Sequence, residues 1–379
     1  MSRVIVLGGG FGGLAAASAL RGRLPAEDEV VLVDRTDWFA VGFRKTWALL
    51  DPGAWEEGIR SLTPLALRGI QFVQGEVEAI DPVAKTADVG GARLRSDGLI
   101  VALGAEQVPG AVPGFSEHGH NPYAVGDLAQ TSKALREFEG GRLLVGVMGE
   151  PHPCPPAPYE IAYLLRDFYQ ERDIDVDLGV FTPKPSSLPI AGEAGCMIIE
   201  DRLEARGIEF LPNRRAMEVE SGTVQFSSAR EDFDLLLGIP PHRAPDVVVE
   251  AGLTGESGWI EPDAKTLRTE YEGVYAIGDL TNIQMANGKP LPMAGVFAEA
   301  QGVAAAEDIA ALIQGRESEA AFEGEGGCFL EVGGGEAVQV QGRFLAEDGP
   351  QVEVTEPSAD HLEAKHEFEQ ERLQRWFGS

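Results

Sequence analysis

Short apolar runs separated by turns mark the first hundred residues, a pattern typical of buried strands. Residues 3–7 (Arg-Val-Ile-Val-Leu) predict a buried parallel strand, and a glycine-rich turn and an alanine-rich helix at 14–20 follow it. The next strand is expected at 29–34. Strand, helix and strand in this order predict a βαβ unit. Further strands are expected at 71–80 and 94–102.

A second region of the chain repeats this order, with a strand, a helix and a strand at 143–149, 159–169 and 176–181. A strand at 274–279 then returns to the first unit, and 291–313 is mostly helical. Glycine-rich residues 324–335 lead to short strands at 337–345, and 359–377 predict a charged helix.

The pattern therefore predicts an α/β fold with two Rossmann-like dinucleotide-binding domains, the second inserted in the first. A small C-terminal region completes it. The expected boundaries are 1–110 and 241–315 for the two parts of the first domain, 111–240 for the second domain, and 316–379 for the C-terminal region.

Charge and composition narrow the function. The 61 acidic residues outnumber the 31 basic residues, for a net charge of −30, which argues against nucleic acid and against attraction to anionic lipid. No apolar run approaches the length of a membrane-spanning helix. The chain enters its first strand directly after Ser2, so we expect no export signal and a cytoplasmic protein, with the inner face of the cell membrane as an alternative site.

The first turn supplies what a dinucleotide pyrophosphate needs. Gly8 allows the tight turn, Gly10 allows close approach of the phosphates, and Gly13 allows the helix to pack on the strand. The helix N-terminus offers N–H groups to the anion. Asp34 follows Gly13 by 21 residues and is placed to bind a ribose hydroxyl. These residues alone leave NAD and FAD open.

Two later segments favour FAD. Residues 99–104 (Leu-Ile-Val-Ala-Leu-Gly) and 274–279 (Val-Tyr-Ala-Ile-Gly-Asp) resemble motifs of two-dinucleotide-fold flavoproteins. The resemblance implies that an Asp binds the flavin ribityl chain, and residues 289–297 resemble the stretch that covers the flavin. The cofactor-binding residues that it adds are Val77, Gly104, Gly278, Asp279, Gly295 and Val296.

The corresponding turn of the second unit is unsuited to a second dinucleotide. Five prolines lie between Gly149 and Tyr159. Proline removes N–H donors and adds bulk, so we expect poor or no NAD(P)H binding. The prolines could equally serve only to begin the following helix, and the two readings are compatible.

Cysteines 154, 196 and 328 fit no metal site by their spacing. Each is therefore either buried and inert or redox-active. Cys154 lies just before a predicted helix, whose N-terminus is expected to lower the pKa of its thiol.

Residues 154–160 (Cys-Pro-Pro-Ala-Pro-Tyr-Glu) and the Gly-Cys328-Phe segment resemble the two redox motifs of sulfide:quinone oxidoreductases and of the flavoprotein subunit of flavocytochrome c sulfide dehydrogenases. The resemblance implies that Cys154 and Cys328 form a disulfide beside the flavin. Sulfide would reduce that disulfide, and the electrons would pass through FAD to a quinone or a cytochrome. Glu160 would lie near the flavin and move protons; alternatively it is only a helix-stabilising acid.

The chain also departs from these families. Many sulfide:quinone oxidoreductases have a third working cysteine before the first motif, and this chain has none there; Cys196 is expected in a core. FAD is expected to be noncovalent, because no early cysteine is available to attach it. Met293 stands where relatives often have Lys.

The C-terminal segment and the acceptor leave alternatives open. Leu373, Trp376 and Phe377 share one helical face, which either dips into a membrane near a quinone or packs as a structural or dimerising helix. The rival functions are a type II NADH:quinone dehydrogenase, a soluble sulfide dehydrogenase with a protein acceptor, and a non-catalytic flavin redox sensor.

Overall fold

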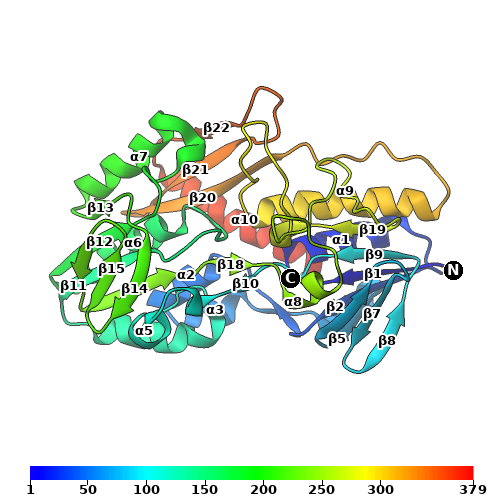
Figure 1. Cartoon of the computed structure of the whole chain (residues 1–379), viewed down its shortest axis with the longest axis horizontal. Coiled ribbons are helices and arrows are strands. Elements are labelled where there is room, and N and C mark those ends of the chain that lie inside the picture. Colours follow the sequence, from blue (N-terminus) through cyan, green and yellow to red (C-terminus); the bar gives the residue numbers. More distant parts are fainter. Residues whose placement is uncertain (379) are drawn as a thin grey trace.

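A computed structural model describes residues 1–378. The first unit is built on a five-stranded parallel sheet (Figure 1), whose strand order is β19, β9, β1, β2, β5. Their bounds are Val274–Ala276, Gly98–Val101, Arg3–Leu7, Glu29–Asp34 and Ile70–Gln74. The late strand β19 pairs with β9, so the chain returns to this sheet after building the second unit. The α/β class predicted from the sequence is confirmed.

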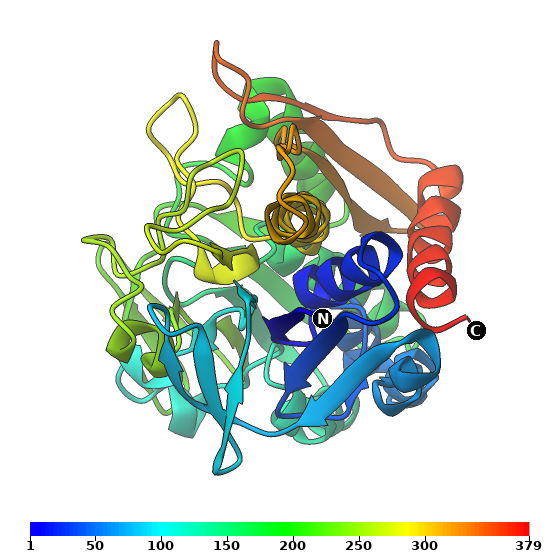
Figure 2. The same ribbon diagram turned by 90° about the vertical axis from the view of Figure 1, so that its right-hand side faces the viewer.

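Both faces of this sheet are covered. Helices α1 (Phe11–Arg23) and α9 (Gly295–Ile313) lie side by side on one face (Figure 2), and Val4 and Val6 of β1 point into that core. Ile5 and Leu7 point into the opposite core, beneath an antiparallel sheet. Its strands are β6 (Val77–Asp81), β7 (Thr86–Val89) and β8 (Ala92–Arg95), and helix α8 (Asp246–Glu250) lies beside them. Burial on both faces explains the uninterrupted apolar run.

The second unit has a four-stranded parallel sheet in the order β13, β12, β11, β17, with the bounds Glu209–Leu211, Val176–Phe181, Gly141–Val147 and Leu235–Ile239. Helices α5 (Leu128–Glu137), α6 (Ala157–Gln170) and α7 (Gly192–Ala205) belong to this unit. An antiparallel sheet of β14 (Ala216–Glu220), β15 (Thr223–Phe226) and β16 (Arg230–Asp232) packs on one face through Phe181 and Phe226. Cys196 of α7 is buried.

A third antiparallel sheet joins the two units (Figure 1). It contains β20 (Glu325–Gly333), β21 (Glu336–Arg343) and β22 (Gln351–Val354). We predicted that residues 324–335 merely lead to short strands, which is wrong: they form most of the nine-residue strand β20. Pairing with β21 along nearly the whole strand offsets the weak strand preference of glycine. The charged helix predicted at 359–377 is α10 (Ala359–Phe377).

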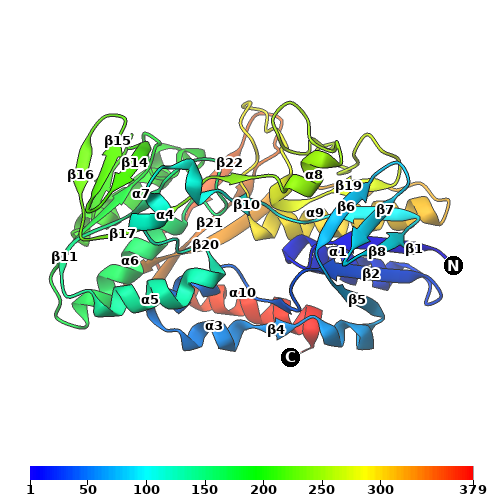
Figure 3. The same ribbon diagram turned by 60° about the horizontal axis from the view of Figure 1, so that its bottom comes forward.

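Helix α10 packs against the chain itself (Figure 3), with Leu373 and Trp376 in the core of the first unit. The Trp376 ring lies edge-on to Phe11 and Phe39, at 5.6 and 5.4 Å between centroids. The apolar face of the tail is thus covered by protein. Among residues 1–378, no helix combines the length and apolar character needed to cross a bilayer.

Short elements complete the connections. They are β3 (Trp38–Phe39), α2 (Arg44–Leu50), α3 (Gly53–Gly58), β4 (Arg60–Ser61), η1 (Thr63–Arg68), β10 (Glu106–Gln107), η2 (Pro109–Ala111), α4 (Phe115–His118), η3 (Val125–Asp127), η4 (Pro189–Ala191), β18 (His242–Arg243) and η5 (Gly278–Leu280).

Candidate active site

The glycine-rich turn between β1 and α1 has the geometry of an anion cradle. Gly8 has φ +110°, and a Cβ there would lie 2.2 Å from the Ala102 carbonyl oxygen. A Cβ on Gly13 would lie 1.7 Å from the Gly8 oxygen, so the helix start contacts the turn directly. A Cβ on Gly10 would meet nothing within 4 Å, which leaves space above the turn. Helix α1 begins there without a side-chain cap, and its first N–H groups face that space.

Asp34 at the end of β2 is half-buried, and its carboxylate is hydrogen-bonded to the glycine-rich turn. Its carboxylate accepts hydrogen bonds from the Gly9 N–H at 2.6 Å and from the Thr36 N–H at 2.8 Å. Val77 begins β6 with its side chain in the core under the sheet. Gly104 follows β9 with φ +69°.

The late segment lies at the same edge of the sheet. The Gly278 N–H donates to Gln301 at 2.6 Å, and Gly278 has φ +79°. Burial raises the pKa of the neighbouring Asp279 to about 6, although the charge of Lys45 opposes the rise. Gly295 begins α9, and its Cβ would lie 2.9 Å from the Phe11 ring, so glycine allows α9 to approach α1. The carboxyl ends of the parallel strands β1, β9 and β19 therefore lie at one edge of the sheet, the edge at which open α/β sheets bind dinucleotides.

Cys154 is held in a left-handed backbone conformation, with φ +54°. Its N–H donates to the Met293 carbonyl at 2.9 Å, and the Tyr123 hydroxyl bonds to the Pro153 carbonyl at 3.0 Å. Such a conformation costs about 1–3 kcal/mol in a non-glycine residue and occurs often at functional sites. These contacts join the cysteine loop to the segment at 289–297.

The helix N-terminus does lower the pKa of the Cys154 thiol, through the Ala157 N–H, but the net shift of that pKa is upward. The side chain is solvent-accessible, yet the surrounding protein desolvates the thiol and raises its pKa to about 12. Glu160 raises it further. Lys365, the Ala157 N–H and Lys45 lower it, but less than desolvation raises it.

Cys328 lies in β20 opposite Val340 and is half-buried against the core of the second unit. Burial raises the pKa of its thiol, and the nearby charges of Cys154 and Glu160 raise it further. The fold has thus brought together two cysteines that are 174 residues apart in the sequence. Both are free thiols in this structure.

Glu160, in the first turn of α6, belongs to a buried ionic cluster. Lys365 of α10 lies 2.9 Å from Glu160 and 2.8 Å from Glu331, and the Glu331 N–H donates to Glu160 at 3.0 Å. The Trp47 indole donates to Glu331 at 2.6 Å. Burial raises the pKa of Glu160 and Lys365 opposes that rise. For Lys365, burial opposes the charged form, but the two carboxylates outweigh it and raise the pKa.

Sequence reasoning missed Lys365, Glu331 and Lys45. Lys365 and Glu331 lie among other charged or glycine-rich residues, and no motif distinguishes them from surface residues. Only the packing of α10 and β20 against α6 reveals the roles of Lys365 and Glu331.

The start of α6 offers little to a second dinucleotide. The Ala157 N–H is bonded to the Cys154 carbonyl at 3.0 Å, Pro158 has no N–H, and the Tyr159 N–H is bonded to Pro156 at 3.1 Å. Lys184 is paired with Glu150 of the same turn at 2.9 Å. The N–H groups that would bind a pyrophosphate are therefore absent or already used.

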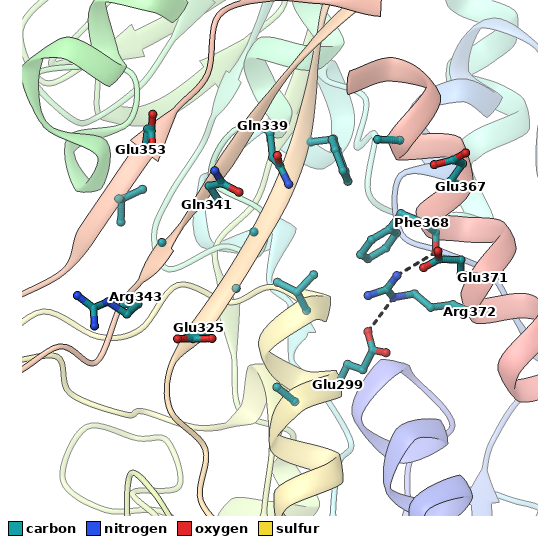
Figure 4. A pocket seen from close by; sticks show the side chains of 18 of the residues that line it. Glu299, Glu325, Gln339, Gln341, Arg343, Glu353, Glu367, Phe368, Glu371 and Arg372 are labelled. Atoms are coloured by element: carbon teal, nitrogen blue, oxygen red, sulfur yellow. Dashed lines mark hydrogen bonds and ion pairs between the residues drawn. The ribbon is translucent and has the colours of Figure 1, made fainter. Parts of the chain in front are cut away.

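A groove of about 1190 Å³ lies between α9, α10 and the sheet of β20 to β22 (Figure 4). Phe368 lies beside the groove, and Arg372 bonds to Glu299 at 2.7 Å. Because side chains alternate along a strand, Gly327 and Phe329 line the groove while Cys328 faces the opposite side of β20. Val296, next to Gly295, also lines the groove.

Comparisons with known proteins agree with this picture. Residues 2–146 match the pyridine nucleotide-disulphide oxidoreductase family. The chain is 27% identical over 299 residues to the mitochondrial sulfide:quinone oxidoreductase of Mus musculus, covering 74% of this chain and 66% of that one. It is 26% identical over 342 residues to the alternative NAD(P)H-ubiquinone oxidoreductase C1 of Arabidopsis thaliana, covering 76% and 63%. The chain thus spans slightly less than two-thirds of each relative's length.

The crystal structure of the sulfide:quinone oxidoreductase from Aquifex aeolicus superposes with a TM-score of 0.89 at 22% identity, covering 99% of this chain and 91% of that one. This likeness establishes the overall fold.

Proposed function

We propose that this chain is an FAD-dependent oxidoreductase of the pyridine nucleotide-disulphide oxidoreductase family. In this proposal it oxidises sulfide or a related sulfur species through a Cys154–Cys328 disulfide and passes the electrons to a quinone. The observation that carries the proposal is the meeting of the two cysteines, from the turn before α6 and from β20, beside the segments expected to hold FAD. The open space over Gly10 and the uncapped start of α1 fit the cofactor's pyrophosphate.

HS⁻ attacks the disulfide, so that one cysteine becomes a persulfide and the other a thiolate. A second HS⁻ removes the outer sulfur as HSS⁻, and the two thiolates return to the disulfide. In total, two HS⁻ give one HSS⁻, one proton and two electrons. When bound, FAD supplies the two-electron acceptor that connects this centre to the quinone.

Glu160 is proposed to handle the proton. Burial raises the pKa of its carboxyl, which brings it nearer to neutral pH, where a proton-transfer group works best. Lys365 binds Glu160 and Glu331 together and orients the carboxylate on α6, so its role is positioning.

The groove between α9 and α10 is proposed to receive the quinone. Its apolar side chains include Val296, Phe329 and Phe368, and Gln339 and Gln341 can donate to quinone oxygens. Val296 adjoins the expected flavin segment, and β20 separates the groove from Cys328. Donor and acceptor would then react on different sides of one strand.

The main alternative function is that of an NAD(P)H:quinone oxidoreductase, the activity named for the relative from Arabidopsis thaliana. The engaged N–H groups at the start of α6 and the pairing of Lys184 with Glu150 argue against a bound pyrophosphate. These contacts support sulfide over NAD(P)H as the electron donor.

The test is an anaerobic titration of the flavin-loaded protein with sulfide and, separately, with NADH, following flavin absorbance. We expect bleaching by sulfide alone, and loss of bleaching in C154S and in C328S. The matched control is C196S, which changes a buried cysteine outside the site and should bleach like the unmodified protein. Bleaching by NADH alone, or full bleaching by sulfide in C154S, would refute the proposal. Added decylubiquinone should then reoxidise the sulfide-reduced flavin.

A further inference from the structure

Helix α2 is anchored on one side by two strong contacts. Arg44 binds Glu369 of α10 through two hydrogen bonds of 2.6 and 2.5 Å. Trp47 binds Glu331 of β20 at 2.6 Å. Positions 44 and 47 are three residues apart and share a face of the helix. Both contacts therefore set the rotation of α2 about its axis.

Lys45 projects from a neighbouring face toward the cysteine loop. Its ammonium lies 3.4 Å from the Tyr123 carbonyl oxygen and 5.1 Å from the centre of the Tyr123 ring. The Tyr123 hydroxyl in turn donates to the Pro153 carbonyl at 3.0 Å and lies 3.4 Å from that of Cys154. Lys45 is thus fixed against the segment that carries Cys154, and within residues 1–378 it forms no ion pair with a carboxylate.

The other charges around Cys154 do not favour a thiolate. When ionised, Glu160 places a negative charge near it, and the positive charge of Lys365 is shared between the carboxylates of Glu160 and Glu331. The partner thiol, Cys328, adds a further negative charge when ionised. Lys45 is the remaining cation that acts on Cys154.

The environment of Lys45 points to the same pairing. Burial lowers the pKa of Lys45, while Cys154 first and then Asp279 raise it. The buried His242, of β18, is also affected, because Lys45 contributes to its lowered pKa. Lys45 therefore interacts electrostatically with both Cys154 and the carboxylate expected to bind the flavin ribityl chain.

We propose that Lys45 is the positioning residue whose positive charge stabilises the thiolate of Cys154 when the cysteine pair is reduced. This inference rests on the proposed redox role of that pair. Met293 contributes no such charge, since its side chain is neutral and it meets Cys154 through its backbone carbonyl. The cation of this centre thus comes from α2, a helix that no glycine or cysteine motif includes.

The test measures the thiolate without any sulfide. The flavin-loaded protein is reduced anaerobically with dithiothreitol, which is then removed. Iodoacetamide alkylation of Cys154 is followed by mass spectrometry from pH 6 to 10, in the unmodified protein, K45M, K45Q, K45R and the exposed-lysine control K133M. Alkylation follows the thiolate fraction, so loss of the charge should slow the reaction at pH 8 by about tenfold or more. K45R should stay within about threefold, and K133M should not change.

Equal alkylation rates across this pH range in K45M, K45Q and the unmodified protein would overturn the inference. Flavin content and circular dichroism identify any variant that fails to fold. If K45M fails to fold, K45Q removes the same positive charge with a polar side chain. If the Lys45 variants alkylate more slowly but sulfide does not reduce the flavin of the unmodified protein, only the proposed function is refuted. If sulfide does reduce the flavin but the Lys45 variants alkylate at the unmodified rate, only this inference is refuted.

Discussion

Replacing Lys365 with Met should destabilise the protein strongly and in a pH-dependent way. The lysine side chain is 1% exposed, and its ammonium lies 2.9 Å from Glu160 and 2.8 Å from Glu331. K365M would leave two buried carboxylates facing each other without a counter-charge. Breaking a buried ion pair by removing one partner costs about 3–5 kcal/mol, because the remaining charge stays desolvated.

The pH dependence follows from the direction of the Glu160 shift. Burial already raises the pKa of Glu160, and loss of Lys365, which lowers it, would raise it further. An acid whose folded-state pKa lies above its unfolded value destabilises the fold fully above the folded pKa. That penalty disappears as the pH falls toward the unfolded value, about 4.3. The stability difference between K365M and the unmodified protein should therefore be largest near pH 8 and smaller at pH 5.

Urea unfolding followed by tryptophan fluorescence, at one fixed FAD concentration, measures this difference. The double variant K365M/E331Q removes one of the two stranded charges and should recover part of the loss. The control K133M changes an exposed lysine and should leave the midpoint unchanged. Equal midpoints for K365M and the unmodified protein at pH 8, or a difference that grows on acidification, would refute this account of the cluster.

Three further variants test other parts of the structure. G10A places a methyl group in the open space over the turn, so the apoprotein should unfold at an unchanged urea concentration while FAD affinity, measured by fluorescence, falls by about tenfold or more. W376A removes a fully buried ring and should cost about 3–5 kcal/mol in urea unfolding, with faster proteolysis of α10. D279N removes a carboxyl whose pKa is raised to about 6, so the apoprotein should gain stability at pH 7.5, and the gain should vanish below about pH 4. A D279N apoprotein no more stable than the unmodified one would contradict the burial of that charge.

Local sequence patterns determined the repeating units of this fold. The apolar run at 3–7 is β1 because both of its faces are buried, and the charged helix predicted at 359–377 is α10. The glycines at 8, 10 and 13 specify a turn through their own backbone freedom and lack of a side chain, so they can be interpreted without any distant partner. The boundaries at 110, 240 and 315 remain predictions.

Tertiary structure decided what depends on residues distant in the chain. Lys45, Cys154, Cys328 and Lys365 come from α2, the turn before α6, β20 and α10, and no sequence spacing records that these elements meet. The thiol pKa shows the same limit: proximity to a helix N-terminus suggested a lowered value, while desolvation by surrounding elements raises it to about 12. Backbone turns follow from neighbouring residues, but desolvation and charge pairing depend on everything that packs around a group, and only the folded chain brings those groups together.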